Sequence, residues 1–162
     1  MSLFGCSDCV YILARLLTSL IPLTAENNLI GELPPEIGVL KSLETLILSN
    51  NCLHGTIPPE LGKLSSLIEL DVSGNYLSSS IPKEFYNLAM LAQLNLAWNN
   101  QEGSCDRSDG TAADLKSAGL EGEILGPQIA QLSNLQKVLV HVNNFSGTIS
   151  SEIGLLSQLG AL

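Results

Sequence analysis

The sequence of 162 residues contains few aromatic residues, few basic residues and no long hydrophobic segment. Aromatic residues make up 4% of the chain and hydrophobic residues 45%, so the core must be built mainly from aliphatic side chains. Lys and Arg number 7 against 16 Asp and Glu, which gives a formal net charge of −9. Binding to nucleic acid or to anionic lipid needs a basic face. The composition therefore argues against both as partners.

The longest hydrophobic run, residues 10–23 (VYILARLLTSLIPL), is too short to span a bilayer and contains Arg15 and Pro22. The residues before it include no Lys or Arg, although a secretory signal would begin with basic residues. Residues 1–16 are interpreted as a partial N-terminal cap or leader, with a degraded signal as the alternative. We expect the rest of the run to begin the repeat described below, and no direct membrane insertion of this chain.

Cysteine is sparse, and the usual catalytic motifs are missing. Cys6 and Cys9 form one C-x-x-C pair, but Cys52 and Cys105 do not supply the second pair that a zinc site would need. We interpret the cysteines as disulfide remnants of a terminal cap, and we expect no metal and no cofactor. The sequence contains neither GxxxxGK nor HExxH, and its two histidines lie in no catalytic motif. The chain is therefore predicted not to be an enzyme.

The sequence repeats itself at a fixed interval. The phrases NNLIGELP, NCLHGTIP and NYLSSSIP begin at Asn27, Asn51 and Asn75, and Asn99 follows at the same spacing of 24 residues. Between them run LKSLETLILSNN, LSSLIELDVSGN and LAMLAQLNLAWN, and a later copy, LSNLQKVLVHVN, leads to Asn143. Alternating leucines predict a short strand in each copy, and each asparagine is predicted to bond the backbone at a turn. Because one coil cannot bury its own leucines, the coils must stack.

The combined phrase LxxLxxLxLxxNxLxGxIPxxLGxL resembles the plant-type leucine-rich repeat of receptor-like kinases, receptor-like proteins and polygalacturonase-inhibiting proteins. The resemblance covers residues 17–162, and the Ile-Pro element typical of this subclass is present at Ile57-Pro58 and Ile81-Pro82. It implies an α/β fold, a right-handed solenoid with a concave parallel β-sheet and short helical turns on the convex side.

The pattern is irregular at about residues 100–118. Gln101 takes a leucine place, and a strand-like phrase at residues 111–116 arrives early, so Ala118 would be the next turn position. Either one continuous solenoid contains a short coil, with a surface loop at residues 101–110, or two blocks were joined by gene rearrangement or a faulty gene model. We favour the continuous solenoid. The final LSQLGAL stops within a strand phrase, so we expect a fragment of a longer protein, unless residues 155–162 fold over as a cap.

Outward strand positions are where a ligand would bind, because inward positions are committed to packing. They form three columns: Thr45, Glu69, Gln93 and Lys137; Ile47, Asp71, Asn95 and Leu139; Ser49, Ser73, Ala97 and His141. These residues except Ala97 are the predicted ligand-binding residues, together with Trp98 at a strand exit, which is either an exposed binding hot spot or packed under the loop. This mildly acidic surface suits a protein or peptide partner. Asn144 begins the sequon NFS and is a possible glycosylation site.

By resemblance, the chain is a non-catalytic recognition module for a protein or peptide ligand, and a fragment of the extracellular region of a receptor-like kinase or receptor-like protein. The alternatives are a secreted inhibitor of a cell-wall-degrading enzyme, similar to polygalacturonase inhibitors, and an intracellular scaffold. The resemblance also implies a signalling glycoprotein located outside the cell or at its surface, with a cytoplasmic location as the alternative. The ligand, the disulfide pairing and the oligomeric state stay open.

Overall fold

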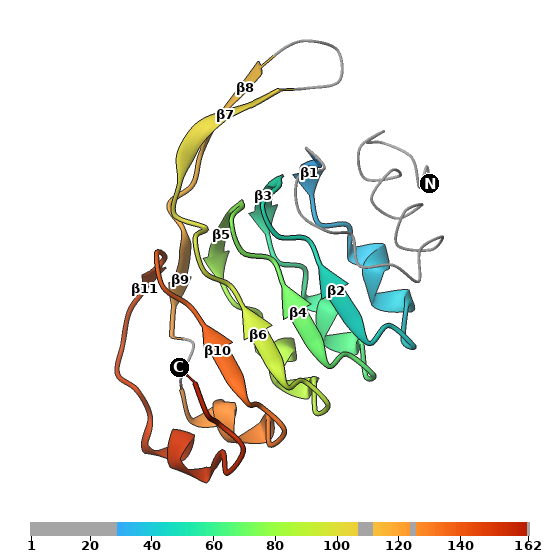
Figure 1. Cartoon of the computed structure of the whole chain (residues 1–162), viewed down its shortest axis with the longest axis vertical. Helices are drawn as coiled ribbons and strands as arrows, with labels where there is room; N and C mark the ends of the chain where they lie inside the picture. The colour runs from blue at the N-terminus through green and yellow to red at the C-terminus, as the bar shows by residue number, and fades with distance from the viewer. Residues whose placement is uncertain (1–28, 107–111, 124–125, 162) are drawn as a thin grey trace.

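The computed structural model describes residues 29–106, 112–123 and 126–161, and in this part of the chain successive coils stack into a solenoid (Figure 1). A regular coil contributes one short strand to each of two parallel sheets and one 3-10 helix. The predicted N-terminal cap at residues 1–16 and the turn asparagine Asn27 lie outside the described residues. No helix within the described part is long and apolar enough to cross a bilayer.

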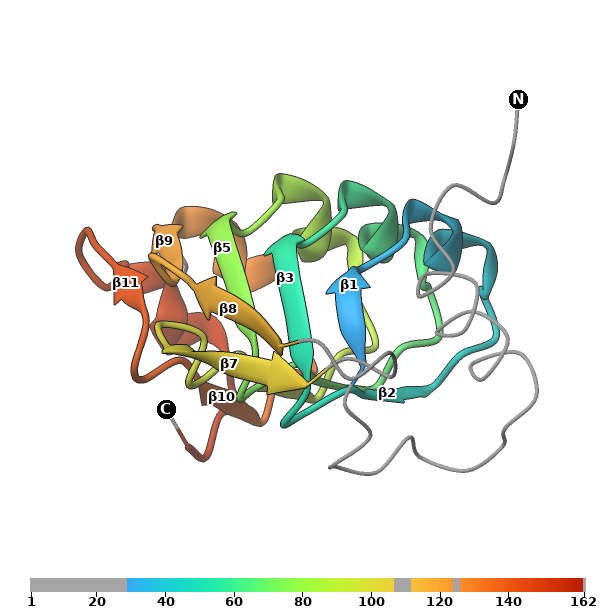
Figure 2. The same cartoon turned by 90° about the horizontal axis from the view of Figure 1, so that it is seen from above.

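The two sheets line adjacent sides of the solenoid. The concave sheet consists of β2 (Thr45–Ile47), β4 (Glu69–Asp71), β6 (Gln93–Asn95) and β10 (Lys137–Leu139), all parallel and paired in that order. The second sheet consists of β1 (Ile30–Glu32), β3 (Cys52–Thr56), β5 (Tyr76–Ser80), β9 (Leu120–Gly122) and β11 (Asn144–Phe145), also parallel. Seen from above, this second sheet lies between the helices and the concave sheet (Figure 2).

Short 3-10 helices line the convex side. They are η1 (Pro35–Val39), η2 (Pro59–Lys63), η3 (Lys83–Asn87), η4 (Pro127–Gln131) and η5 (Ser151–Leu155). Each follows an extended residue; in η2, for example, Pro58 holds this conformation and Pro59 begins the helix. The N–H of Leu61 then donates to the Pro58 carbonyl at 3.0 Å, and the N–H of Leu64 donates to the Leu61 carbonyl at 3.1 Å, which closes the tight turn.

The core fills the space between the sheets and the helices. The central residue of every concave strand points inward, so Leu46, Leu70, Leu94 and Val138 form one buried row across four coils. Leucines and isoleucines from the helices complete the cluster from the convex side. Burying each such side chain contributes about 1.5–3 kcal/mol. Stacking of neighbouring coils is therefore the main source of stability, as the repeat predicts.

A ladder of asparagines links each coil to the one before it. Asn75 is fully buried, and its Oδ1 accepts the N–H of Leu53 from the preceding coil at 3.0 Å. Its Nδ2 donates to the carbonyl of Leu48, also in the preceding coil, and to the carbonyls of Val72 and Ser73 in its own. The same bridge to the preceding coil's backbone N–H is made by Asn51, Asn99 and Asn143.

The irregular segment is a hairpin inserted into a continuous solenoid. β7 (Glu102–Asp106) and β8 (Ala112–Lys116) pair with each other in antiparallel orientation and extend away from the two sheets (Figure 1). The solenoid continues beneath them, because Lys137 in β10 pairs directly with Gln93 in β6. Leu120 completes the interrupted coil by donating its N–H to Asn143 Oδ1 at 3.1 Å, as Leu77 does to Asn99 Oδ1. Residues 101–119 are therefore additional to a regular coil.

This arrangement corrects the interpretation of a short coil. The phrase at residues 111–116 does not form a concave strand, because β8 satisfies its backbone hydrogen bonds with β7 instead of with a neighbouring coil. Ala118 does not take over the role of a turn asparagine either. Ser117 joins this point to the preceding coil: its Oγ donates to the Leu77 carbonyl at 2.7 Å and accepts the Gly119 N–H at 3.0 Å.

The spacing of coils on the convex side depends on glycine. A β-carbon at Gly62 would lie 2.2 Å from the carbonyl oxygen of Glu84 in the next coil, so only glycine allows η2 and η3 to pack this closely. Tyr86 stands at the corresponding position of η3, where contact with the following helix η4 is less extensive. Burial of the Tyr86 ring, followed by repulsion from Glu123, raises the pKa of its phenol above the ordinary value of 10.0.

The last described residues continue the solenoid. The N–H of Val138 donates to the carbonyl of Ala161 at 3.0 Å, and Ala161 pairs in parallel with Lys137 at the position of a further concave strand. The alternative of residues 155–162 folding over as a cap is therefore wrong. Ile149 in this coil is 61% exposed, whereas Ile57 at the corresponding place is buried, because no further coil covers Ile149 in the described chain.

Candidate functional site

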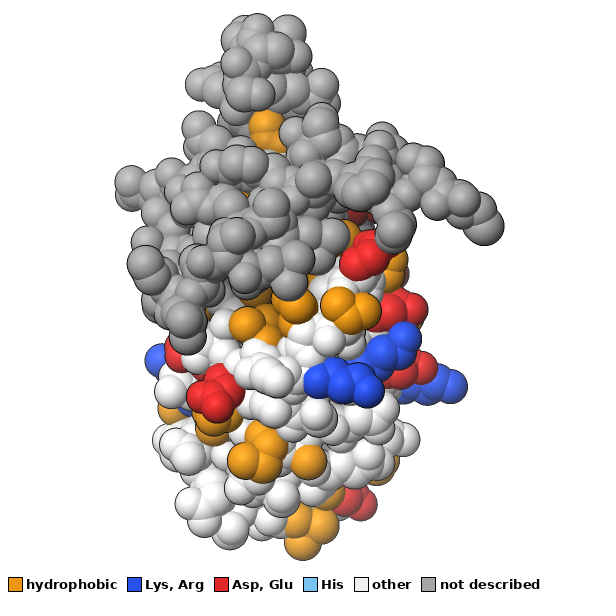
Figure 3. Space-filling view, turned by 90° about the vertical axis from the view of Figure 1, so that its right-hand side faces the viewer, with side chains coloured by type: hydrophobic (Ala, Val, Ile, Leu, Met, Phe, Trp, Pro, Cys, Tyr) orange, Lys and Arg blue, Asp and Glu red, His pale blue; other side chains and the backbone are white. Residues whose placement is uncertain are grey.

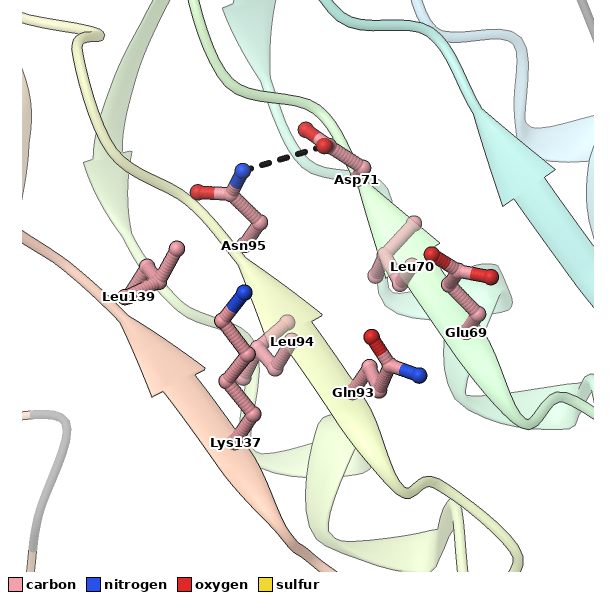
Figure 4. A pocket seen from close by; sticks show the side chains of 8 residues that line it. All are labelled: Glu69, Leu70, Asp71, Gln93, Leu94, Asn95, Lys137 and Leu139. Atoms are coloured by element: carbon pink, nitrogen blue, oxygen red, sulfur yellow. Dashed lines mark hydrogen bonds between the residues drawn. The ribbon is translucent and has the colours of Figure 1, made fainter. Parts of the chain in front are cut away.

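The concave sheet presents two rows of outward side chains that run across the coils. Strand register places Thr45, Glu69, Gln93 and Lys137 in one row and Ile47, Asp71, Asn95 and Leu139 in the next. Six of these side chains, together with Leu70 and Leu94 of the strands beneath, line a hollow: Glu69, Asp71, Gln93, Asn95, Lys137 and Leu139 (Figure 4). Residues that the sequence predicts for ligand binding are thus brought together over β4, β6 and β10.

Part of the hollow is fixed by internal hydrogen bonds. The Asp71 carboxylate accepts the backbone N–H and the hydroxyl of Ser73, at 2.9 and 2.6 Å. Asn95 donates through Nδ2 to the other carboxylate oxygen of Asp71 at 3.0 Å, across the boundary between β4 and β6 (Figure 4). Asn95 Oδ1 in turn accepts the Ala97 N–H at 3.2 Å. These bonds hold the side chains of Asp71 and Asn95 in one arrangement.

The neighbouring row has no such internal bonds. Among the described residues, the side chains of Glu69, Gln93 and Lys137 have no hydrogen-bond or ion-pair partner. Glu69 and Gln93 lie side by side on β4 and β6, while Lys137 extends from β10 (Figure 4). One carboxylate, one amide and one ammonium group therefore stand in register along the row, available to donate to and accept from an extended chain.

The third predicted column is corrected by the structure. Ser49 and Ser73 are each 9% exposed and Ala97 is buried, so these residues offer almost no surface to a ligand. The cause is their place after the strand ends, where the chain already turns inward toward the buried asparagine. Ser73 serves instead as an internal link between Asp71 and Asn95. Only His141 of this column is exposed.

Trp98 is on the surface. Its side chain is 52% exposed, and its ring meets that of His141 edge to face, with centroids 5.7 Å apart and an angle of 86° between the planes. Gln101 donates to the Trp98 backbone carbonyl. Sequence reasoning missed Val142, a hydrophobic residue of this neighbourhood that is 39% exposed. Its position directly before Asn143, like that of Trp98 directly before Asn99, was the signal that could have identified it.

The other residues that the sequence singles out lie outside the hollow. Asn144 of the sequon is exposed in β11, and Cys52 in β3 is disulfide-bonded. Cys6 and Cys9 lie outside the described residues. Within the described ranges, no three His, Cys, Asp or Glu side chains are grouped as metal ligands would be. The face nearest β2 carries separate hydrophobic patches among charged side chains of both signs (Figure 3).

Comparison with known proteins decides the family. A family model for leucine-rich repeats in two copies matches residues 41–88. The plant peptide hormone receptor RGFR1, solved in complex with RGF2, superimposes with a TM-score of 0.71 at 32% sequence identity. The chain belongs to the plant-type leucine-rich repeat family. The match covers 88% of this leucine-rich repeat chain but only 19% of the receptor chain.

Two further structures show the range of proteins that share these repeats. The ectodomain of the receptor kinase SOBIR1 from Arabidopsis thaliana matches with a TM-score of 0.65 at 28% identity, over 85% of this leucine-rich repeat chain and 63% of SOBIR1. A plant ice-binding protein matches with a TM-score of 0.66 at 27% identity, over 87% of this chain and 42% of that protein. Comparison with curated protein sequences gives no match.

Proposed function

We propose that the concave sheet binds an extended peptide, or an extended segment of a protein, without catalysing a reaction. The observation that carries this proposal is the row of Glu69, Gln93 and Lys137, in register across three coils and without partners among the described residues. A peptide laid across the row meets donors and acceptors at regular intervals. Asp71 and Asn95 in the next row are already held by hydrogen bonds, so they lose little conformational freedom on binding.

The proposal extends to an extracellular ligand-binding region of a receptor-like kinase or receptor-like protein. Similarity to a peptide hormone receptor and to a receptor-kinase ectodomain supports this role. A disulfide at Cys52 fits an oxidising compartment, and an exposed Asn144 is accessible to a glycosylating enzyme. Expression in secretory cells tests the location: we expect secreted chain with a glycan on Asn144, and retention of a reduced, unmodified chain contradicts it.

Peptide selection tests the binding surface. Twelve-residue peptides displayed on phage are selected on the chain, and the affinity of the most enriched peptide is measured by calorimetry. The triple variant Glu69→Ala, Gln93→Ala, Lys137→Ala is expected to weaken binding at least about tenfold, because a few residues dominate such interfaces. Its matched control is Thr56→Ala, Ser80→Ala, Glu121→Ala, which removes three exposed side chains from the second sheet. Loss of binding in the control alone overturns the proposal.

A further inference from the structure

We infer that Trp98, His141 and Val142 form an anchor site for one apolar side chain of a basic peptide, at the end of the concave hollow. This inference rests on the proposed function and specifies its ligand. Trp98 follows β6 and His141 follows β10, so both lie just beyond Asn95 and Leu139, the last hollow-lining residues of these strands. The N–H of Trp98 donates to the His141 carbonyl at 3.0 Å. This hydrogen bond holds the segments that follow β6 and β10 side by side.

The first argument is backbone conformation. The residue before each turn asparagine adopts a left-handed conformation, with φ of 54° at Asn50, 65° at Gly74, 59° at Trp98 and 54° at Val142. Asparagine and glycine adopt this conformation readily, whereas a bulky or β-branched residue does so only against steric resistance. Two adjacent coils of the concave sheet therefore carry, at this position, residues that are poorly suited to the local fold.

The second argument is exposure. Trp98 and Val142 are 52% and 39% exposed, so neither recovers the conformational cost through burial in the core. Strained residues that persist without a packing benefit are found at sites of ligand binding. The edge-to-face contact with His141 restricts the Trp98 ring, and a preoriented aromatic surface binds an apolar side chain with less loss of conformational freedom.

The third argument is charge, which selects the peptide. The two outward rows of the concave sheet contain the carboxylates of Glu69 and Asp71 on β4 and a single cation, Lys137, on β10. The whole chain has a formal net charge of −9. A basic peptide is attracted by this field, and an acidic peptide is repelled. The preferred ligand therefore combines an apolar anchor residue at Trp98 with basic residues over β4.

The experiment uses the most enriched displayed peptide and copies of it in which each apolar residue is replaced by alanine. Trp98 is the single tryptophan, so its fluorescence reports occupancy of the anchor directly. We expect the peptide to change the emission of Trp98, and one alanine copy to lose this effect. Trp98→Asn should weaken binding at least tenfold and Val142→Asn about threefold, in the range of interface hot spots and their neighbours.

Two controls separate binding from folding. Val39→Asn removes an exposed valine from the end of η1, on the convex side, and should leave the affinity unchanged. Because asparagine occupies the same backbone position at Asn50, Trp98→Asn and Val142→Asn should melt at the same temperature as the unaltered chain or a few degrees higher. A lower melting temperature in both contradicts the strain argument.

The outcomes distinguish the anchor from the proposed function. If Trp98→Asn binds normally while the triple variant of Glu69, Gln93 and Lys137 does not, the anchor is wrong and the concave site stands. If enriched peptides are acidic or contain no apolar residue, the assigned chemistry is wrong. If no peptide is enriched over the bare support, or none of these variants changes the affinity, both proposals are wrong.

Discussion

The middle coils and the last described coil follow the same sequence phrase, yet they bury it to different extents. Leu61 in η2 is fully buried, whereas Ile153, at the corresponding place in η5, is only partly buried. η2 lies between η1 and η3, while η5 contacts η4 on one side. Asn75 is likewise fully buried, and Asn143 only in part. The comparison shows that burial is a property of the stack, because each coil depends on neighbours on both sides.

The largest predicted difference concerns the core leucine position. Leu61→Ala should lower the free energy of unfolding by about 3–4 kcal/mol, because it leaves a cavity between two packed coils. Ile153→Ala should cost only about 1–2 kcal/mol, because its site is partly open to solvent. Urea unfolding followed by circular dichroism measures both values. Equal losses would show that the flanking coils do not determine burial.

The asparagine ladder should show the same gradient at a smaller scale. Asn75→Ala leaves the buried Leu53 N–H without an acceptor, and should cost about 2 kcal/mol. The carbonyls of Leu48, Val72 and Ser73 also lose a hydrogen bond, but each keeps one other donor. Asn143→Ala should cost about 1 kcal/mol, because water can reach the groups that it leaves. Glu69→Ala, which removes a surface carboxylate, serves as the control and should change stability by less than about 0.5 kcal/mol. Similar losses for Asn75→Ala and Glu69→Ala would disprove the ladder's role.

Glycine offers a matched pair on the convex side. Gly62→Ala places a methyl group against the Glu84 carbonyl and should cost about 1–3 kcal/mol. Gly154→Ala, at the corresponding place in η5, meets no atom within 4 Å and should be neutral or stabilise by up to about 1 kcal/mol. Thermal unfolding of the two variants gives the comparison. A destabilised Gly154→Ala variant would indicate that this helix is already covered.

The smallest predicted effect comes from removing the hairpin. Deletion of residues 101–119 joins Asn100 to Leu120 and restores the spacing seen at Asn75 and Leu77. Because β6 already pairs with β10, the shortened chain should unfold cooperatively, with stability within about 1 kcal/mol of the intact chain when both are measured with their cysteines reduced. Loss of a cooperative transition would show that the hairpin is required for the two parts of the solenoid to join.

Features that depend on periodicity could be predicted from the sequence, and features that depend on one local contact could not. The interval of 24 residues places Asn51, Asn75 and Asn99 at equivalent points, and stacking then brings outward strand residues into register. The sequence of β8 in the inserted hairpin resembles the strand phrase of a repeat. The sequence alone therefore could not distinguish a hairpin from a short coil. The burial of Ser49 and Ser73 follows from the turn after each strand, which an alternation pattern does not describe.

The central claim is that the concave sheet is the recognition surface, and nuclear magnetic resonance tests it most directly. The side-chain amides of Gln93 and Asn95 and the backbone amides of β4, β6 and β10 are followed while the selected peptide is added to 15N-labelled chain. The account predicts that these resonances shift, while those of β3 and β5 in the second sheet stay in place. Shifts confined to the second sheet or to the β7–β8 hairpin would contradict it.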